Sequence, residues 1–260
     1  RLLSKVPAFY RTPDHSTLRP RLAGNLPLNC EGMGISPMPS CFGAPCLARR
    51  ALADIARPIA AILLLGVVTP ESSVRPRRIV VGVSGASGAA LGLECLKCLR
   101  QAGAESALVV TRGGEITIEQ ELGMTLDEFA CHADVVYDNK NIGAAIASGT
   151  YPVDGMIVAP CSMKTLAGIA SGYSENLLLR AADVQMKEQR RLVLMVRETP
   201  FSAIHVDNMA RLARVPGVML MPPMLTFYNG PATLDDAVHH IAAKALEAVG
   251  VSCANYKRWS

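Results

Sequence analysis

The sequence has few aromatic residues and little net charge, and both shortages limit what the protein can be. Only 5% of the 260 residues are aromatic, and 26 Lys and Arg against 22 Asp and Glu give a formal charge of +4. A nucleic-acid-binding surface requires clustered basic side chains. Here the basic residues are scattered, so nucleic-acid binding is not indicated.

Long apolar runs and regularly spaced cysteines are missing as well. The longest apolar run outside the predicted core, residues 59–68, is too short to span a bilayer. The eight cysteines have no dense, regular spacing, so we expect reduced thiols in a reducing compartment, the cytoplasm. No Cys or His pattern has the spacing of a metal site, and none is predicted, either for Cys30, Cys41 and Cys46 or for the pair His239–His240.

The first part of the chain differs from the rest. Ten of the 17 prolines lie within the first 76 residues, and no helical or strand period is sustained before residue 48. Such a segment buries little apolar surface. We therefore expect residues 1–75 to be a poorly ordered or non-native N-terminal extension.

Residues 77–251 alternate between buried-strand and helix patterns. Apolar, β-branched runs predict strands at 78–83, 107–110, 154–159, 192–196 and 218–221. Helices are expected between and after them, at 91–99, 114–131, 141–148, 162–170, 177–190, 203–213 and 233–249. This alternation predicts a Rossmann-like, doubly wound parallel sheet in a three-layer α/β/α domain, followed by a tail, 252–260.

A glycine-rich turn, Ser84–Ala89, follows the first predicted strand. Backbone N–H groups at the start of the next helix can hold a phosphate there. Gly85 and Gly88 with two serines favour phosphate or flavin contact over a turn needed only for packing. The full dinucleotide pattern is absent, and no acidic residue ends the second strand, so NAD is disfavoured.

Polar residues also follow the strands at 154–159 and 192–196. Ligands of open parallel sheets bind beyond the carboxyl ends of the strands, so both clusters are expected to form one site. Arg197, directly after a strand, can hold phosphate bidentately, and Glu198 can act as acid or base or can orient the arginine. Cys161 is interpreted as a structural thiol, and Cys95 and Cys98 as small residues within a helix.

Five segments make the chain recognisable: GVSGASGA (82–89), PCSMKTLAGI (160–169), RAADVQMKE (180–188), RLVLMVRETPFSAIH (191–205) and MPPMLTFYNGP (221–231). Together they resemble the UbiX-like flavin prenyltransferases, and among them the members associated with phenolic-acid decarboxylase systems. The resemblance covers about residues 77–260.

The resemblance implies a metal-independent enzyme that joins the dimethylallyl group of dimethylallyl phosphate to reduced FMN. The product, prenylated FMN, serves UbiD-type decarboxylases of hydroxybenzoate or phenolic acids, and members assemble as trimers and dodecamers. The implied FMN contacts are Gly85, Ala86, Ser87, Thr111, Ser162, Met163, Lys164, Thr165 and Arg197. The implied donor contacts are Tyr228 and Lys244, and the implied catalytic groups are Glu198, Ser87, Lys187 and Arg180.

Two other functions stay open from the sequence. A flavin-dependent cysteine decarboxylase of the phosphopantothenoylcysteine type shares this fold, but its strand-end Asn is missing from Pro160–Thr165. A non-catalytic FMN-binding subunit of an aromatic-acid decarboxylase is the second alternative. Incubation with reduced FMN and dimethylallyl phosphate distinguishes both from a prenyltransferase.

Overall fold

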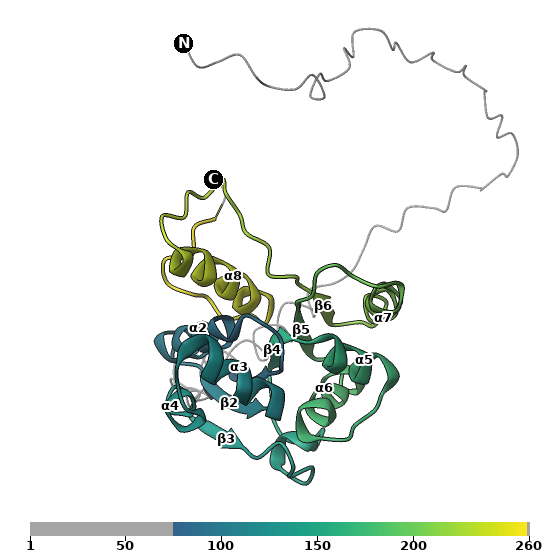
Figure 1. Ribbon diagram of the computed structural model, residues 1–260. Coiled ribbons are helices and arrows are strands. Elements are labelled where there is room, and N and C mark those ends of the chain that lie inside the picture. The colour runs from purple at the N-terminus through teal and green to yellow at the C-terminus, as the bar shows by residue number, and fades with distance from the viewer. Residues whose placement is uncertain (1–74, 259–260) are drawn as a thin grey trace, which may run out of the picture. The chain divides into compact units, whose positions relative to one another are not determined.

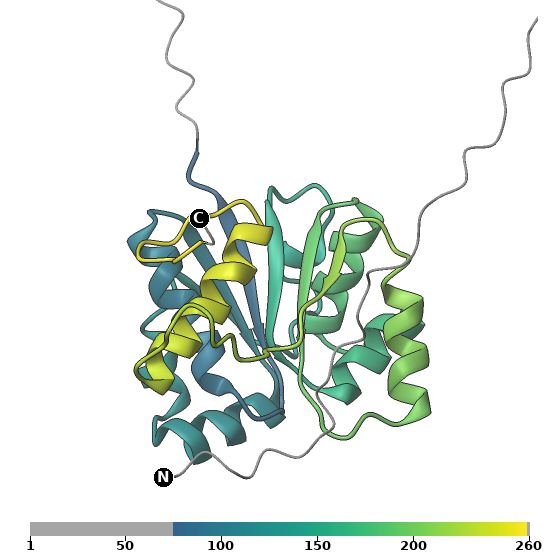
Figure 2. The same ribbon diagram turned by 90° about the horizontal axis from the view of Figure 1, so that it is seen from above.

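The computed structural model describes residues 75–258, which belong to one compact unit, Thr69–Ser260. The predicted N-terminal extension, apart from Arg75, lies outside the described residues. Six parallel strands form one sheet in the order β3-β2-β1-β4-β5-β6 (Figures 1 and 2). The strands are β1 (Arg78–Val83), β2 (Glu105–Val110), β3 (Val135–Tyr137), β4 (Gly155–Cys161), β5 (Arg191–Val196) and β6 (Val218–Leu220).

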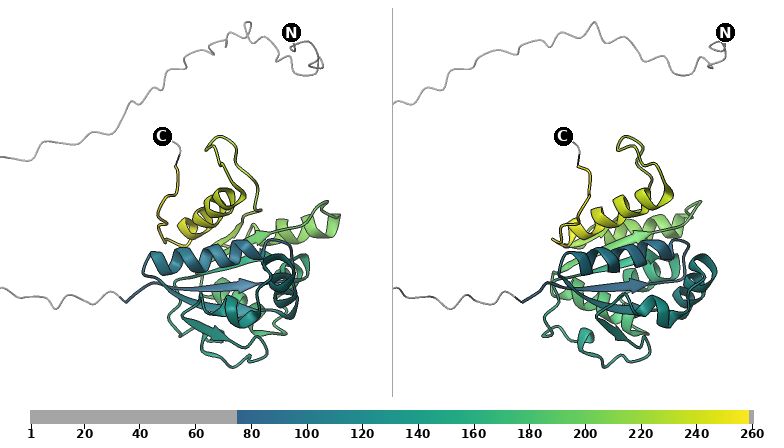
Figure 3. Two further views of the ribbon diagram at one scale, coloured as in Figure 1. Left: turned by 60° about the vertical axis from the view of Figure 1, so that its left-hand side comes forward. Right: turned by 90° about the vertical axis from the view of Figure 1, so that its left-hand side faces the viewer.

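Helices cover both faces of this sheet (Figure 3). One face carries α2 (Ala89–Gln101), α3 (Arg112–Leu122), α4 (Leu126–Ala130) and α8 (Leu234–Ala248). The other carries η1 (Ala145–Ala147), α5 (Met163–Ser171), α6 (Leu177–Lys187) and α7 (Ala203–Leu212). The predicted doubly wound, three-layer fold is therefore confirmed.

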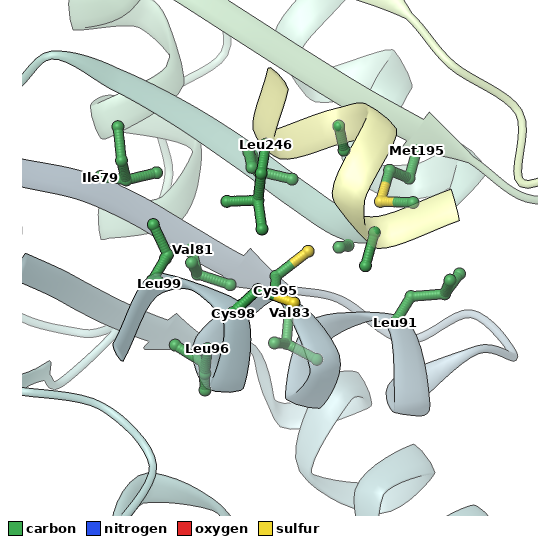
Figure 4. Close-up of a cluster of buried hydrophobic side chains, with 14 of the residues drawn as sticks. Ile79, Val81, Val83, Leu91, Cys95, Leu96, Cys98, Leu99, Met195 and Leu246 are labelled. Atoms are coloured by element: carbon green, nitrogen blue, oxygen red, sulfur yellow. The ribbon is translucent and has the colours of Figure 1, made fainter. Parts of the chain in front are cut away.

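The strands read as continuous apolar runs because both of their faces are buried. In β1, Ile79, Val81 and Val83 join the core under α2 and α8, which Figure 4 shows, whereas Val80 points into the core under α5 and α6. Glycine lets α2 lie close to the sheet, since a Cβ on Gly92 would stand 2.6 Å from the carbonyl oxygen of Ala159. The start of α2 is thereby held against β4.

The prediction of one continuous helix over 114–131 is wrong, because the structure has two helices there, α3 and α4. Gly123, with a φ of +63°, ends α3, and Thr125 begins α4 with a capping box to Glu128. The strand β3 was not predicted because it has three residues, none of them fully buried. The helix expected at 141–148 is only the short turn η1.

Two further boundaries differ from the sequence prediction. The strand expected to break at Pro160 continues to Cys161. The helix expected at 177–190 ends at Lys187 as α6, and its cap is Asn176, whose side chain accepts the N–H of Leu179 at 3.0 Å. None of the helices between residues 75 and 258 combines the length and apolar character that a bilayer crossing requires.

Candidate active site

The strand order reverses between β1 and β4, so the turns after these two strands border a crevice at the carboxyl end of the sheet. Ser84, fully buried at the end of β1, joins the two turns. Its hydroxyl donates to the carbonyl of Pro160 at 2.8 Å and accepts the N–H of Ser162 at 2.8 Å. Sequence reasoning assigned Ser84 no role, although it opens the glycine-rich turn.

The turn after β1 also contacts the start of α3. A Cβ on Gly85 would stand 2.9 Å from the Cα of Gly113, closer than real Cβ atoms approach a backbone. Thr111 lies beside them, and its backbone N–H donates to the carbonyl of Val83 at 2.9 Å. Its hydroxyl caps α3 by accepting the N–H of Gly114 at 3.1 Å. Gly85 and Thr111, both predicted flavin contacts, are thus neighbours.

Replacing Gly85 by alanine should separate these two turns. Because the added methyl meets backbone, which cannot rotate away, we expect a loss of about 1–3 kcal/mol in the free energy of unfolding and weaker FMN binding. Gly143→Ala is the matched control, since its Cβ would have only an ordinary contact, 3.6 Å from Asn141. Urea unfolding and flavin-fluorescence titration measure both effects. Equal behaviour of the two variants would contradict the close approach.

A carboxylate occupies the N-terminus of α2. Glu121, in the last turn of α3, accepts the N–H groups of Gly88 and Ala89, each at 2.8 Å. Burial acts to raise its pKa, but hydrogen bonds from Ser87, Ala89 and Gly88 and the charge of Arg197 lower that pKa overall. A second anion would be repelled here, so this turn suits a flavin ring better than a phosphate. Glu121 had no signal in the sequence because it lies 33 residues from Gly88.

Glu121 should stabilise the protein in a pH-dependent way. Its folded-state pKa is lowered, so its contribution is present above its ordinary value near 4.5 and is lost as pH falls through the lower folded value. A charge at a helix N-terminus contributes about 0.3–1 kcal/mol. We expect Glu121→Gln to lower the free energy of unfolding by that amount at pH 7 and by less near pH 3. A difference that grows on acidification would contradict this assignment.

The N-terminus of α5 offers an anion site that no acid fills. Ser162 caps this helix by accepting the N–H of Thr165 at 3.3 Å, and its hydroxyl donates to that of Thr165 at 3.1 Å. The first turn contains no acidic residue, and Lys164 is exposed there. Helix N–H groups and a lysine together attract phosphate. The predicted contacts at 162–165 therefore have chemistry that fits the phosphate of FMN.

Arg197 and Glu198 follow β5 at the same edge of the sheet. The N–H of Arg197 donates to the carbonyl of Cys161 at 3.1 Å, and its charge acts on Glu121. Glu198 is partly buried and accepts the N–H of Thr199 at 3.0 Å. Cys161 is fully buried, and burial raises the pKa of its thiol to about 12, which agrees with its interpretation as a structural thiol.

Tyr228 and Lys244 line one cavity of about 440 Å³ beside α8. Tyr256 and Arg258 of the C-terminal tail line it too. Glu247 accepts hydrogen bonds from Lys244 at 3.0 Å and from Arg258 at 2.9 Å. The structure thus brings the two predicted donor contacts together in a largely apolar pocket that contains the cation of Lys244, and the tail adds a second cation, Arg258.

Arg180 and Lys187 lie elsewhere in the chain. Both belong to α6, on the face of the sheet opposite α8, where Arg180 pairs with Asp183 at 2.7 Å and Lys187 pairs with Glu188. Lys187 ends α6 near the loop before β4, to which Arg190 is hydrogen-bonded. Lys187 therefore lies at the amino end of the sheet, away from the predicted flavin-binding turns. One chain alone therefore does not assemble all the predicted groups.

Comparison with known proteins agrees with the fold. Residues 67–246 match the model of the Flavoprotein family. A probable UbiX-like flavin prenyltransferase of Streptomyces sp. (strain D7) is 50% identical over 184 residues, which are 70% of this chain and 92% of the relative.

Two solved structures are similar. AnUbiX (PadA1), in complex with FMN and dimethylallyl pyrophosphate, has a TM-score of 0.70 and 40% identity, covering 72% of this chain and 98% of that one. The dodecameric FMN-dependent UbiX-like decarboxylase of Escherichia coli O157:H7 has a TM-score of 0.68 and 46% identity, covering 70% and 99%. The chain therefore belongs to the UbiX-like flavin prenyltransferases of the flavoprotein family.

Proposed function

We propose that this protein transfers the dimethylallyl group of dimethylallyl phosphate to reduced FMN, and that residues 77–251 carry the reaction. The proposal rests on one observation: the chain contains both a site that fits a flavin and a pocket that fits a phosphate. Helix N-termini capped by the hydroxyls of Thr111 and Ser162 at the carboxyl end of the sheet fit a flavin, and a pocket with the cation of Lys244 beside Tyr228 fits a phosphate. AnUbiX, the similar structure, holds both kinds of molecule.

The turns after β1, β2, β4 and β5 hold FMN in this proposal. Gly85, Ala86 and Ser87 contact the ring system, and the α5 N-terminus and Arg197 bind the phosphate through N–H groups and positive charge. The remaining contacts are Thr111 and the residues Ser162, Met163, Lys164 and Thr165. Bound reduced FMN supplies the nucleophilic ring atoms that accept the prenyl group.

Cations stabilise the phosphate that leaves the donor. Lys244 binds it beside Tyr228, and Arg180 and Lys187 come from a second chain, because α6 and α8 lie on opposite faces of one sheet. A trimer, or the dodecamer described for the E. coli protein, would bring two chains together at each site. Residues 252–258 border the donor pocket, so the tail shapes it.

Glu198 moves the proton that the flavin ring carbon loses. It is partly buried beside Arg197, and a carboxylate within reach can act as a general base. Ser87 orients the flavin, since its hydroxyl is fixed by Glu121 at the start of α2. Neither step uses a metal.

The product is proposed to serve a UbiD-type decarboxylase in the cytoplasm, where the five described cysteines remain the free thiols that they are in the structure. The test incubates the protein anaerobically with reduced FMN and dimethylallyl phosphate, removes it by filtration and adds the filtrate to a cofactor-free decarboxylase. Decarboxylation that depends on every component is expected. No activation, with FMN still bound, would indicate a non-catalytic flavin-binding subunit.

A further inference from the structure

Three side chains with metal-binding atoms meet between α2 and α8, outside the proposed active site. In the cluster Glu94–Cys98–His239, one ligand atom from each residue lies within 4.8 Å of the others. The sequence predicted no metal partner for His239, since 141 residues separate it from Cys98.

The ring of His239 is oriented as metal-binding imidazoles are. Its Nε2 lies 3.0 Å from the carbonyl oxygen of Ala254, to which it must donate a hydrogen. Such a bond leaves Nδ1 with its lone pair in the neutral ring. Nδ1 faces the carboxylate of Glu94 at 2.8 Å, so two acceptors meet unless a proton or a cation stands between them.

The distances within the cluster match a tetrahedral zinc site. Bonds of about 2.3 Å to sulfur and about 2.0 Å to nitrogen or oxygen separate tetrahedral ligand atoms by roughly 3.3–3.6 Å. The Cys98 sulfur lies 3.7 Å from Nδ1 of His239 and 3.5 Å from Oε1 of Glu94. Only the pair Nδ1 and Oε1 would have to widen, by roughly 0.5 Å.

We propose that Glu94, Cys98 and His239, with a water molecule in the fourth position, form a Zn²⁺ site that fastens α8 to α2. One thiolate, one imidazole and one carboxylate suit zinc rather than magnesium or calcium, which prefer oxygen ligands alone. Binding releases the thiol proton to solvent. The proposal does not depend on the prenyl transfer, in which this ion takes no part.

The surroundings of the cluster let an ion enter from solvent and connect the ion to the donor pocket. Glu94 and His239 line an open cavity of about 430 Å³, whereas Cys98 lies buried beneath α8, as Figure 4 shows. An ion on Nδ1 fixes the ring of His239, whose Nε2 donates to the carbonyl of Ala254 in the tail. Ala254 stands two residues before Tyr256, which packs on His240 with ring centroids 5.1 Å apart. Tyr256 and Arg258 border the donor pocket, so the ion would hold one wall of that pocket in place.

Cobalt(II) is the probe for this site because thiolate-bound cobalt absorbs in the near ultraviolet and tetrahedral cobalt absorbs in the visible. The full chain is reduced, stripped with a chelator and titrated anaerobically. We expect one cobalt per chain with both absorptions, and displacement by Zn²⁺. Cys98→Ser and His239→Gln should each weaken binding by more than the roughly 10- to 100-fold that loss of a supporting hydrogen bond costs.

The control variant is Cys131→Ser, which removes an exposed thiol outside the cluster and should bind cobalt as the wild type does. His239→Gln, at a partly exposed position, keeps the test valid if Cys98→Ser does not fold. Unchanged charge-transfer absorption in folded His239→Gln or Cys98→Ser would overturn the proposal. A reduced wild-type protein that binds no cobalt would overturn it as well.

Discussion

Replacing Glu198 by glutamine should leave FMN bound and slow prenyl transfer by roughly 100- to 10,000-fold, the usual contribution of a general acid or base. The amide oxygen of glutamine can still accept the N–H of Thr199, so the loop after β5 keeps its conformation. It cannot take up a proton at neutral pH, so only the chemical step is lost. Rapid-mixing kinetics of the flavin spectrum separate that step from flavin binding.

Glu119→Gln is the matched control for Glu198→Gln. Glu119 is an exposed glutamate on α3 with no assigned role, so its variant should match the wild type in FMN affinity and in rate. If Glu198→Gln transferred the prenyl group at the wild-type rate, Glu198 would not move the proton. Another base, such as the released phosphate, would then have to do so.

Lys187→Ala and Lys244→Ala should each slow the reaction by roughly 100- to 1,000-fold, because each removes a cation from the leaving phosphate. Lys97→Ala, at an exposed position on α2, should have no effect. Steady-state rates with varied dimethylallyl phosphate provide the comparison. A rate unchanged in either lysine variant would remove that lysine from the donor site.

Mixing the two inactive variants tests whether the site takes groups from two chains. If Lys244 of one chain acts with Lys187 of another, equal mixing after dissociation and reassembly gives about a quarter of the sites both lysines. Activity should therefore return to about that fraction of the wild type. If one chain supplied both lysines, every site would lack one of them, and mixing would restore nothing.

The sequence predicted those parts of the fold that depend on local pattern. Four of the six strands are apolar runs buried on both faces, and such runs are visible without the structure. β6, which is only partly buried, was also predicted from its apolar residues. β3 was not predicted, because its three residues do not form a longer apolar run buried on both faces. Gly123 was an unrecognised helix end, since a left-handed cap depends on backbone conformation as well as on residue type.

Site residues could be predicted where they directly follow a strand. They could not be predicted where packing brings them in from an element distant in the sequence. Ser162, Thr165 and Arg197 stand directly after β4 and β5, so the rule for parallel sheets places them at one edge. Glu121 reaches the start of α2 only because α3 packs beside it. No local pattern can predict such a contact.

Lys187 and the Glu94–Cys98–His239 cluster show the same limit of prediction from local sequence. The family resemblance implied Lys187 as a catalytic group, but α6 runs back along the sheet and places it at the amino end. His239 and Cys98 meet because α8 packs on α2. In both cases helix packing, rather than residue spacing, decides which groups lie together.

Mass spectrometry of the flavin formed from reduced FMN and dimethylallyl phosphate tests the proposed reaction most directly. The flavin released from the anaerobic mixture should be heavier than FMN by one five-carbon prenyl unit, and its spectrum should differ from that of FMN. Omitting the protein or the donor should leave FMN unchanged. Recovery of FMN alone from protein that binds both molecules would contradict prenyl transfer by this chain.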